Sequence, residues 1–109
     1  MADRADLLQG TLDLLVLKSL VLAPLHGWAI SKRIRQLSSD VLQVNQGSLY
    51  PALYRLEEKG WLTAEAGISP EGRKAKLYQL TGEGRRQLAD EHDGWRLFAT
   101  AVERVLAAT

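Results

Sequence analysis

The order of apolar and polar residues along the chain predicts a series of helices interrupted by one β-hairpin. Over residues 7–22, apolar side chains cover most of a helix circumference, and Pro24 prevents the helix from continuing. A helix that is apolar on all sides must be covered on nearly all sides, which a domain of 109 residues can hardly do alone. The first helix therefore points to contact with a partner subunit.

A second helix is expected to start after Gly27 and to end near Leu37. Its apolar residues Ile30, Ile34 and Leu37 recur at i, i+4 and i+7, which predicts one buried face. Residues 38–40 break this helix, and residues 41–44 predict a short extended piece.

A third helix is expected to begin between Asn45 and Ser48, which are both good capping residues, and to end at Gly60. Pro51 favours a late start, because proline is tolerated only near the first turn of a helix. The same i, i+4, i+7 spacing predicts a buried face formed by Leu49, Leu53 and Leu56.

Residues 61–66 and 74–80 predict two strands, joined by a turn that is rich in glycine and proline. Thr81 then caps a last helix, with Glu83 in its first turn. Apolar residues of this helix follow coiled-coil spacing, with one polar break at Glu91 or His92. The residues expected at a dimer interface are Leu88, Trp95, Phe98, Val102 and Val105.

This order of elements is that of a winged helix-turn-helix followed by a dimerisation helix, a mostly α fold with a small β-hairpin. Residues 1–80 are expected to form the DNA-binding part. Residues 81–109 are expected to form the dimerisation helix, within a single compact unit.

Composition narrows the class of protein without deciding its function. The chain has no cysteine, and 14 basic residues against 13 acidic ones give a net charge of +1, so bulk charge does not support nucleic-acid binding. The N-terminus lacks a secretory signal, and the apolar stretch over residues 12–25 is too short to span a bilayer. We therefore expect a cytoplasmic protein.

The outward side of the third helix carries side chains that suit the major groove of B-DNA, where an α-helix fits. Arginine pairs with guanine, glutamine prefers adenine, and basic residues on the hairpin and second helix suit the phosphate backbone. Glu58 is unfavourable beside phosphates and is expected beyond the edge of the DNA. The expected DNA-binding residues are Lys32, Gln46, Ser48, Tyr50, Tyr54, Arg55, Arg73, Lys74 and Lys76.

Other interpretations stay open at this point. Tyr50 and Tyr54 are also compatible with packing against the hairpin, and the basic residues 73–76 with an ordinary solvated loop. Winged helices also serve as protein-interaction modules that do not bind DNA, so the fold alone does not settle function. Salt dependence separates the two classes, because binding through several phosphate contacts weakens steeply as salt rises.

Four segments together resemble PadR-type transcriptional regulators: residues 9–17, 26–28, 47–62, and 73–81 with Gly84. The resemblance extends from about Leu7 to Leu106. It implies a dimeric regulator of a family whose members are mostly repressors. It further implies that the third helix reads DNA through Gln46, Ser48, Tyr50, Tyr54 and Arg55, and that Arg73, Lys74 and Lys76 form the basic wing. It also implies that the last helix packs on the first helix of the partner, and the chain resembles the short branch without a larger C-terminal domain. A two-fold dimer predicts an inverted-repeat operator.

Some short members of that family bind flat aromatic compounds between tryptophans at the dimer interface. We therefore expect Trp95 and Phe98 to line an effector pocket, the alternative being that both are core residues of the dimer. The acidic run with His92 over residues 90–93 cannot converge on one ion, because adjacent helix residues point in different directions. No metal, cofactor or enzymatic activity is expected, since no catalytic constellation is recognisable.

Overall fold

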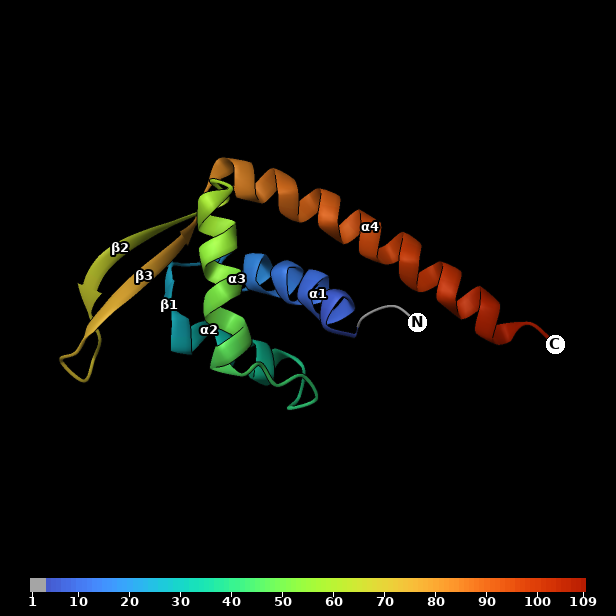
Figure 1. Cartoon of the computed structure of the whole chain (residues 1–109), viewed down its shortest axis with the longest axis horizontal. Coiled ribbons are helices and arrows are strands. Elements are labelled where there is room, and N and C mark those ends of the chain that lie inside the picture. The colour runs from blue at the N-terminus through green and yellow to red at the C-terminus, as the bar shows by residue number, and fades with distance from the viewer. Residues whose placement is uncertain (1–3) are drawn as a thin grey trace.

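The computed structural model describes residues 4–109, with side chains from Gly10 onward. The expected fold class is confirmed: helices dominate, and a small antiparallel sheet forms the wing of a winged helix. The elements in chain order are α1 (Arg4–Ser19), β1 (Leu25–His26), α2 (Gly27–Leu37), α3 (Gln46–Glu58), β2 (Leu62–Ile68), β3 (Lys74–Leu80) and α4 (Gly82–Ala107) (Figure 1).

The sheet contains one strand more than the predicted hairpin. Its order is β1-β3-β2, with Leu25 of β1 opposite Tyr78 and Leu62 of β2 opposite Leu80. The two residues of β1 are too few to show an alternating pattern, so the sequence did not reveal them. β2 runs two residues further than expected, to Ile68, and residues 41–44 form no strand.

The hydrophobic core lies where α1, α2 and α3 meet the base of the sheet. Each fully buried aliphatic side chain contributes about 1.5–3 kcal/mol relative to an exposed one. The largest fully buried side chains are Val16, Leu17, Ile30, Leu49, Leu53, Leu56 and Leu62.

The buried faces expected for the second and third helices are confirmed with one exception. Leu37 is 73% exposed and is the last residue of α2. The buried face of α3 is also wider than predicted, since Ala52 is fully buried beside the three leucines.

α3 begins at Gln46, within the range predicted for its start, although Pro51 then lies five residues into the helix and not near its first turn. Asn45 caps the helix, because its side-chain oxygen accepts a hydrogen bond of 2.9 Å from the backbone N–H of Ser48. Gly60, at a φ of +79°, lets the chain leave the helix and enter β2.

Thr81 joins the end of α3 to the start of α4. Its hydroxyl donates to the carbonyl of Gly60 at 2.8 Å and accepts from the N–H of Gly84 at 2.9 Å, which confirms the predicted cap. From this point α4 runs alongside α1 and projects well beyond the rest of the molecule, opposite the wing (Figure 1). The molecule is therefore elongated, measuring 57 × 28 × 25 Å.

Candidate nucleic-acid interface

One side of α3 is turned away from the core and carries most of the residues expected to read DNA. Gln46, Ser48, Tyr50 and Tyr54 are all exposed there. The buried side of α3 is formed by Leu49, Ala52, Leu53 and Leu56, and Tyr54 lies roughly opposite it. α3 thus presents a polar and aromatic surface of the kind that enters a major groove, and we call it the reading helix.

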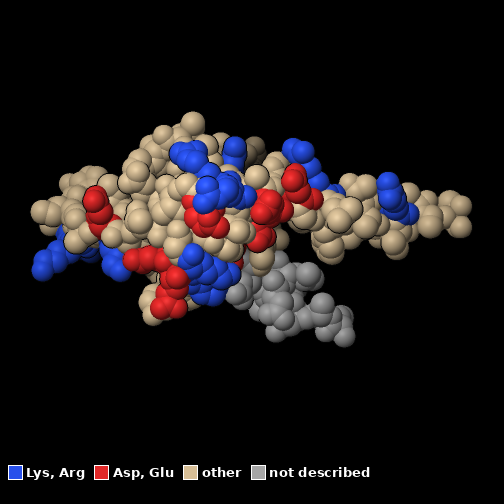
Figure 2. Space-filling view, turned by 90° about the horizontal axis from the view of Figure 1, so that it is seen from above, with Lys and Arg blue, Asp and Glu red and all other residues tan. Residues whose placement is uncertain are grey.

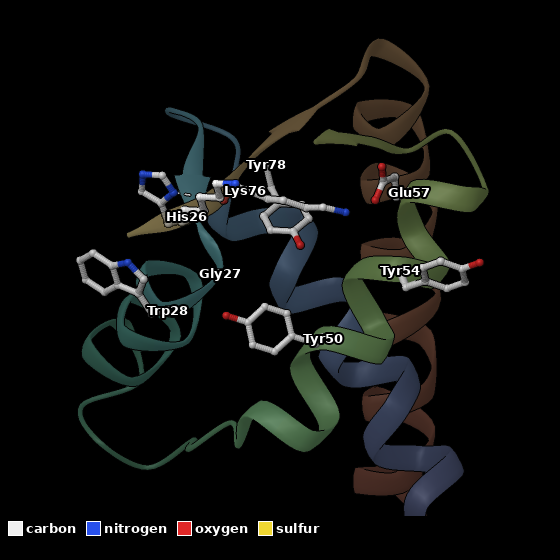
Figure 3. Close-up of a pocket in the computed structure, with 10 residues that line it drawn as sticks. His26, Gly27, Trp28, Tyr50, Tyr54, Glu57, Lys76 and Tyr78 are labelled. Carbon is white, nitrogen blue, oxygen red and sulfur yellow. Dashed lines mark hydrogen bonds between the residues drawn. The ribbon is translucent and has the colours of Figure 1, made fainter. Parts of the chain in front are cut away.

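A cleft of about 420 Å³ separates the reading helix from the wing and from the start of α2. Tyr50 reaches across it from α3 and lies near Tyr78 of β3, with Trp28 at its far side (Figure 3). The residues that line the cleft are His26, Gly27, Trp28, Tyr50, Tyr54, Glu57, Lys74, Ala75, Lys76 and Tyr78.

The wing supplies the positive charge of this surface. Arg73, Lys74 and Lys76 are exposed, and the two lysines line the cleft opposite Tyr50. His26 Nδ1 lies 3.1 Å from the backbone carbonyl oxygen of Lys76, which links β1 to this part of the wing. The fold therefore brings two of the predicted wing residues next to the predicted reading helix.

Tyr54 differs from Tyr50 in its surroundings. It lies further along α3, with its hydroxyl directed away from Tyr50 and Tyr78 (Figure 3). Hydrogen bonding to Glu58, together with the negative charge of that carboxylate, raises the pKa of Tyr54. The Tyr54 hydroxyl thus keeps its proton and acts as a hydrogen-bond donor to Glu58, whose negative charge remains on this surface.

Arg55 does not lie with the other predicted reading residues. Its guanidinium Nη2 lies 2.9 Å from Oδ1 of Asp13 on α1. Arg55 follows the buried Ala52 by three residues, so it occupies the flank of α3 that faces α1. Asp13 is 42 residues earlier in the chain, and no local pattern links the two.

Lys32 is exposed on α2, away from the cleft. It borders a separate hollow of about 260 Å³ with Arg35 and with residues 43–44, which immediately precede the cap of the reading helix. Lys32 is therefore placed near the N-terminal end of α3, whereas the lysines of the wing lie along its middle.

Charge is distributed locally and does not form one large basic face. Seen from above, acidic and basic side chains alternate over the middle of the molecule, and basic side chains also gather at the wing end (Figure 2). This agrees with the net charge of +1 and leaves the wing as the positively charged part of the surface around the cleft.

The comparisons with known proteins agree with this geometry. The model of the Transcriptional regulator PadR-like family matches residues 16–90. The chain belongs to this family. It is thus a transcriptional regulator of a DNA-binding, winged-helix type, which is not a class of enzyme.

Solved structures and a curated relative extend the similarity over most of the chain. A transcriptional regulator from Clostridium thermocellum is 25% identical, with a TM-score of 0.82 and coverage of 91% of this chain and 96% of that one. A PadR-family regulator from Eggerthella lenta is 31% identical, with a TM-score of 0.78 and coverage of 95% and 88%. A Lysinibacillus sphaericus protein described as "Uncharacterized protein X" is 29% identical over 92 residues, 84% of each chain.

In this PadR-like regulator a second surface follows α4. Trp95 and Phe98 are 44% and 52% exposed, and their ring centroids lie 6.3 Å apart. Val102 and Val105 continue the same side of the helix and are also exposed, and we call these four residues the α4 stripe. Leu88, which the sequence grouped with them, packs partly against the core of its own chain.

The described part of the PadR-like chain holds neither a metal-binding cluster nor a membrane-spanning helix. Among the side chains of residues 10–109, no group of three or more histidine, cysteine or acidic residues is arranged to hold a metal ion. Among the helices of the same residues, none is long and apolar enough to cross a membrane.

Proposed function

We propose that this chain is a homodimeric repressor that binds an inverted-repeat operator in double-stranded DNA. The observation that carries the proposal is the cleft itself. It places exposed side chains of the reading helix directly opposite Lys74 and Lys76 of the wing. A helix that can enter the major groove beside basic side chains that can contact phosphates is an arrangement suited to DNA recognition.

In this proposal each part of the surface has its own role. Gln46 and Ser48, at the N-terminal end of α3, approach base edges, and Tyr50 and Tyr54 follow along the groove. The wing residues 73–76 and Lys32 contact phosphates, which fix the position of the protein without reading sequence.

The α4 stripe supports dimerisation, with a second copy of the chain as the partner. Four apolar side chains in a row on a helix that projects beyond its own domain form the kind of patch that marks an interface. We propose that α4 packs on α1 and α4 of the partner, so that residues 1–80 form the DNA-binding head and residues 81–109 the dimerisation helix. Two-fold symmetry then presents two reading helices to successive major grooves.

The pair formed by Trp95 and Phe98 also supports binding of a planar aromatic effector at the dimer interface. Aromatic rings offset by a few ångströms can accept a flat ligand by stacking, worth about 0.5–1.5 kcal/mol per ring pair. Binding there would change how the two α4 helices pack. That change would release the operator and restore transcription in the cytoplasm.

Selection of bound duplexes from a random DNA library, with purified full-length protein at moderate salt, tests this function. We expect an inverted repeat whose half-sites lie about one helical turn, roughly 10 base pairs, apart. Recovery of unrelated sequences at every salt concentration would overturn the proposal. It would instead favour a winged-helix module that binds another protein.

A further inference from the structure

The ion pair between Asp13 and Arg55 connects α1 to the reading helix. The guanidinium Nη2 lies 2.9 Å from the carboxylate Oδ1, and the two side chains are 14% and 32% exposed for Asp13 and Arg55 respectively. Within the described chain it is the most shielded of the ion pairs, since the other two lie on exposed side chains. Removing charges from water opposes folding, so a shielded ion pair at this position calls for an explanation of what it contributes.

A gain in the stability of the folded state does not explain the Asp13–Arg55 ion pair. Burial raises the pKa of Asp13, and the opposing attraction of Arg55 and Lys59 does not overcome it. The positive charges beside the carboxylate therefore do not fully offset the effect of its burial on the pKa. An apolar pair of similar volume would hold α1 against α3 equally well.

A charged hydrogen bond depends strongly on the relative orientation of the two groups that form it. It fixes the relative rotation and height of two helices more sharply than aliphatic contacts, which allow small sliding movements. Asp13 lies on α1 and Arg55 lies nine residues into α3, between the residues that face the cleft and those that face the core. The pair therefore acts on the rotation of the reading helix about its own axis.

We propose that Arg55 is a positioning residue, which holds the reading helix in its DNA-binding orientation through Asp13 and does not read a base. This inference rests on the proposed function, because it assumes that α3 enters the groove. It also links two surfaces, since α1 packs against both α3 and α4. The orientation of the reading helix is thereby tied to the helix that neighbours the α4 stripe.

The test uses Asp13→Asn, Arg55→Gln and the double variant in the full chain, with the operator found by selection. We expect each single change to weaken operator binding by a similar factor, on the order of tenfold, and the double change to be no worse than either. Preference at every base position stays unchanged, and Arg55→Lys restores part of the affinity. Asp90→Asn, the same chemical change on an exposed part of α4, leaves binding unaltered.

Thermal unfolding of every variant separates positioning from loss of fold: the midpoint should change little in Asp13→Asn and in the double variant, and Arg55→Gln, which removes the partner of the shielded carboxylate, should lower it most. Amide hydrogen exchange gives a readout without DNA: α3 should exchange faster in Asp13→Asn than in the Asp90→Asn control. If Arg55→Gln relaxes preference at one base pair while Asp13→Asn binds as wild type does, Arg55 reads a base and the proposal fails. It also fails if both variants bind normally. Failure of the wild type to bind any duplex would instead refute the proposed function.

Discussion

Tyr50 lies directly over Gly27. A Cβ atom added to Gly27 would lie 2.9 Å from the hydroxyl oxygen of Tyr50 and 3.0 Å from its Cε1. The first residue of α2 thus has no side chain because a side chain of the reading helix occupies the space. This contact fixes the position of the Tyr50 ring, which lines the cleft together with Gly27.

Gly27→Ala is therefore expected to displace Tyr50 and to weaken operator binding several-fold. The protein should lose little stability, because Tyr50 is half-exposed and its ring can swing outward. Fluorescence anisotropy with labelled operator measures the affinity, and thermal unfolding measures the stability. In a Tyr50→Ala background the glycine substitution should have no further effect on affinity. Additive losses would show that Gly27 acts independently of Tyr50.

Lys74→Ala and Lys76→Ala should each weaken binding to all DNA sequences alike. The slope of log affinity against log salt is negative, and each lost phosphate contact makes it less steep by about 0.9. Salt titrations with operator and with unrelated duplexes check this. Arg104→Ala, on an exposed part of α4 away from the wing, serves as the control and should keep the wild-type slope. A change in sequence preference would assign the lysine to a base and not to a phosphate.

Gly84→Ala should be strongly destabilising. An added Cβ would overlap the backbone carbonyl oxygen of Trp61, and the nearby Leu80 side chain leaves no room for adjustment. Overpacking of this kind costs about 1–3 kcal/mol, and a backbone atom cannot move aside as a flexible side chain can. Gly82→Ala, two residues earlier in the same helix, meets no atom within 4 Å and should unfold at or above the wild-type temperature. Equal melting points for the two variants would contradict this packing.

Val102→Glu should convert the proposed dimer to monomer, because it places a charge in the middle of the α4 stripe. Light scattering coupled to gel filtration gives the molar mass directly. Thr100→Glu adds the same charge to an exposed position off the stripe and should leave the dimer intact. A monomeric wild type, or a Val102→Glu variant that still dimerises, would show that the stripe is not the interface.

Binding of a planar effector predicts a change in tryptophan emission. Titration with acridine should quench wild type and Trp28→Phe alike, and quenching should be lost in Trp95→Phe. Loss in Trp28→Phe instead would place the dye in the cleft beside the reading helix. Unchanged emission in wild type across further planar dyes would exclude the effector pocket.

The helices and the wing could be predicted from the sequence because their signals are local. Leu49, Leu53 and Leu56 repeat at helical spacing, and Thr81 stands one residue before its helix. The start of α3 falls within the predicted range, but Pro51 lies in the second turn, later than the sequence predicts for a proline. Local rules give the type of element more reliably than the position at which it begins.

The candidate site was less predictable because it depends on contacts between distant segments. A helical wheel placed Arg55 outward, and only the packing of α1 against α3 shows that this flank is covered. The cleft likewise requires β1, whose pairing with β3 no pattern revealed. Trp28 lines this cleft, yet only its place beside the conspicuous His26 and Gly27 could have suggested it.

The hydroxyl of Thr81 connects the residue just beyond α3 to the first turn of α4, since it donates to the carbonyl of Gly60 and accepts from the N–H of Gly84. α4 extends 26 residues from this joint, a lever of about 39 Å. A tilt of about 5° at Thr81 would move its far end by about 3 Å, as simple geometry gives for a rod of that length. In a symmetric dimer both α4 helices would tilt, so the relative displacement of their far ends would be twice as large. In the proposed dimer, the distance between the two DNA-binding heads would therefore depend on the geometry at Thr81, together with the packing of α4 on α1.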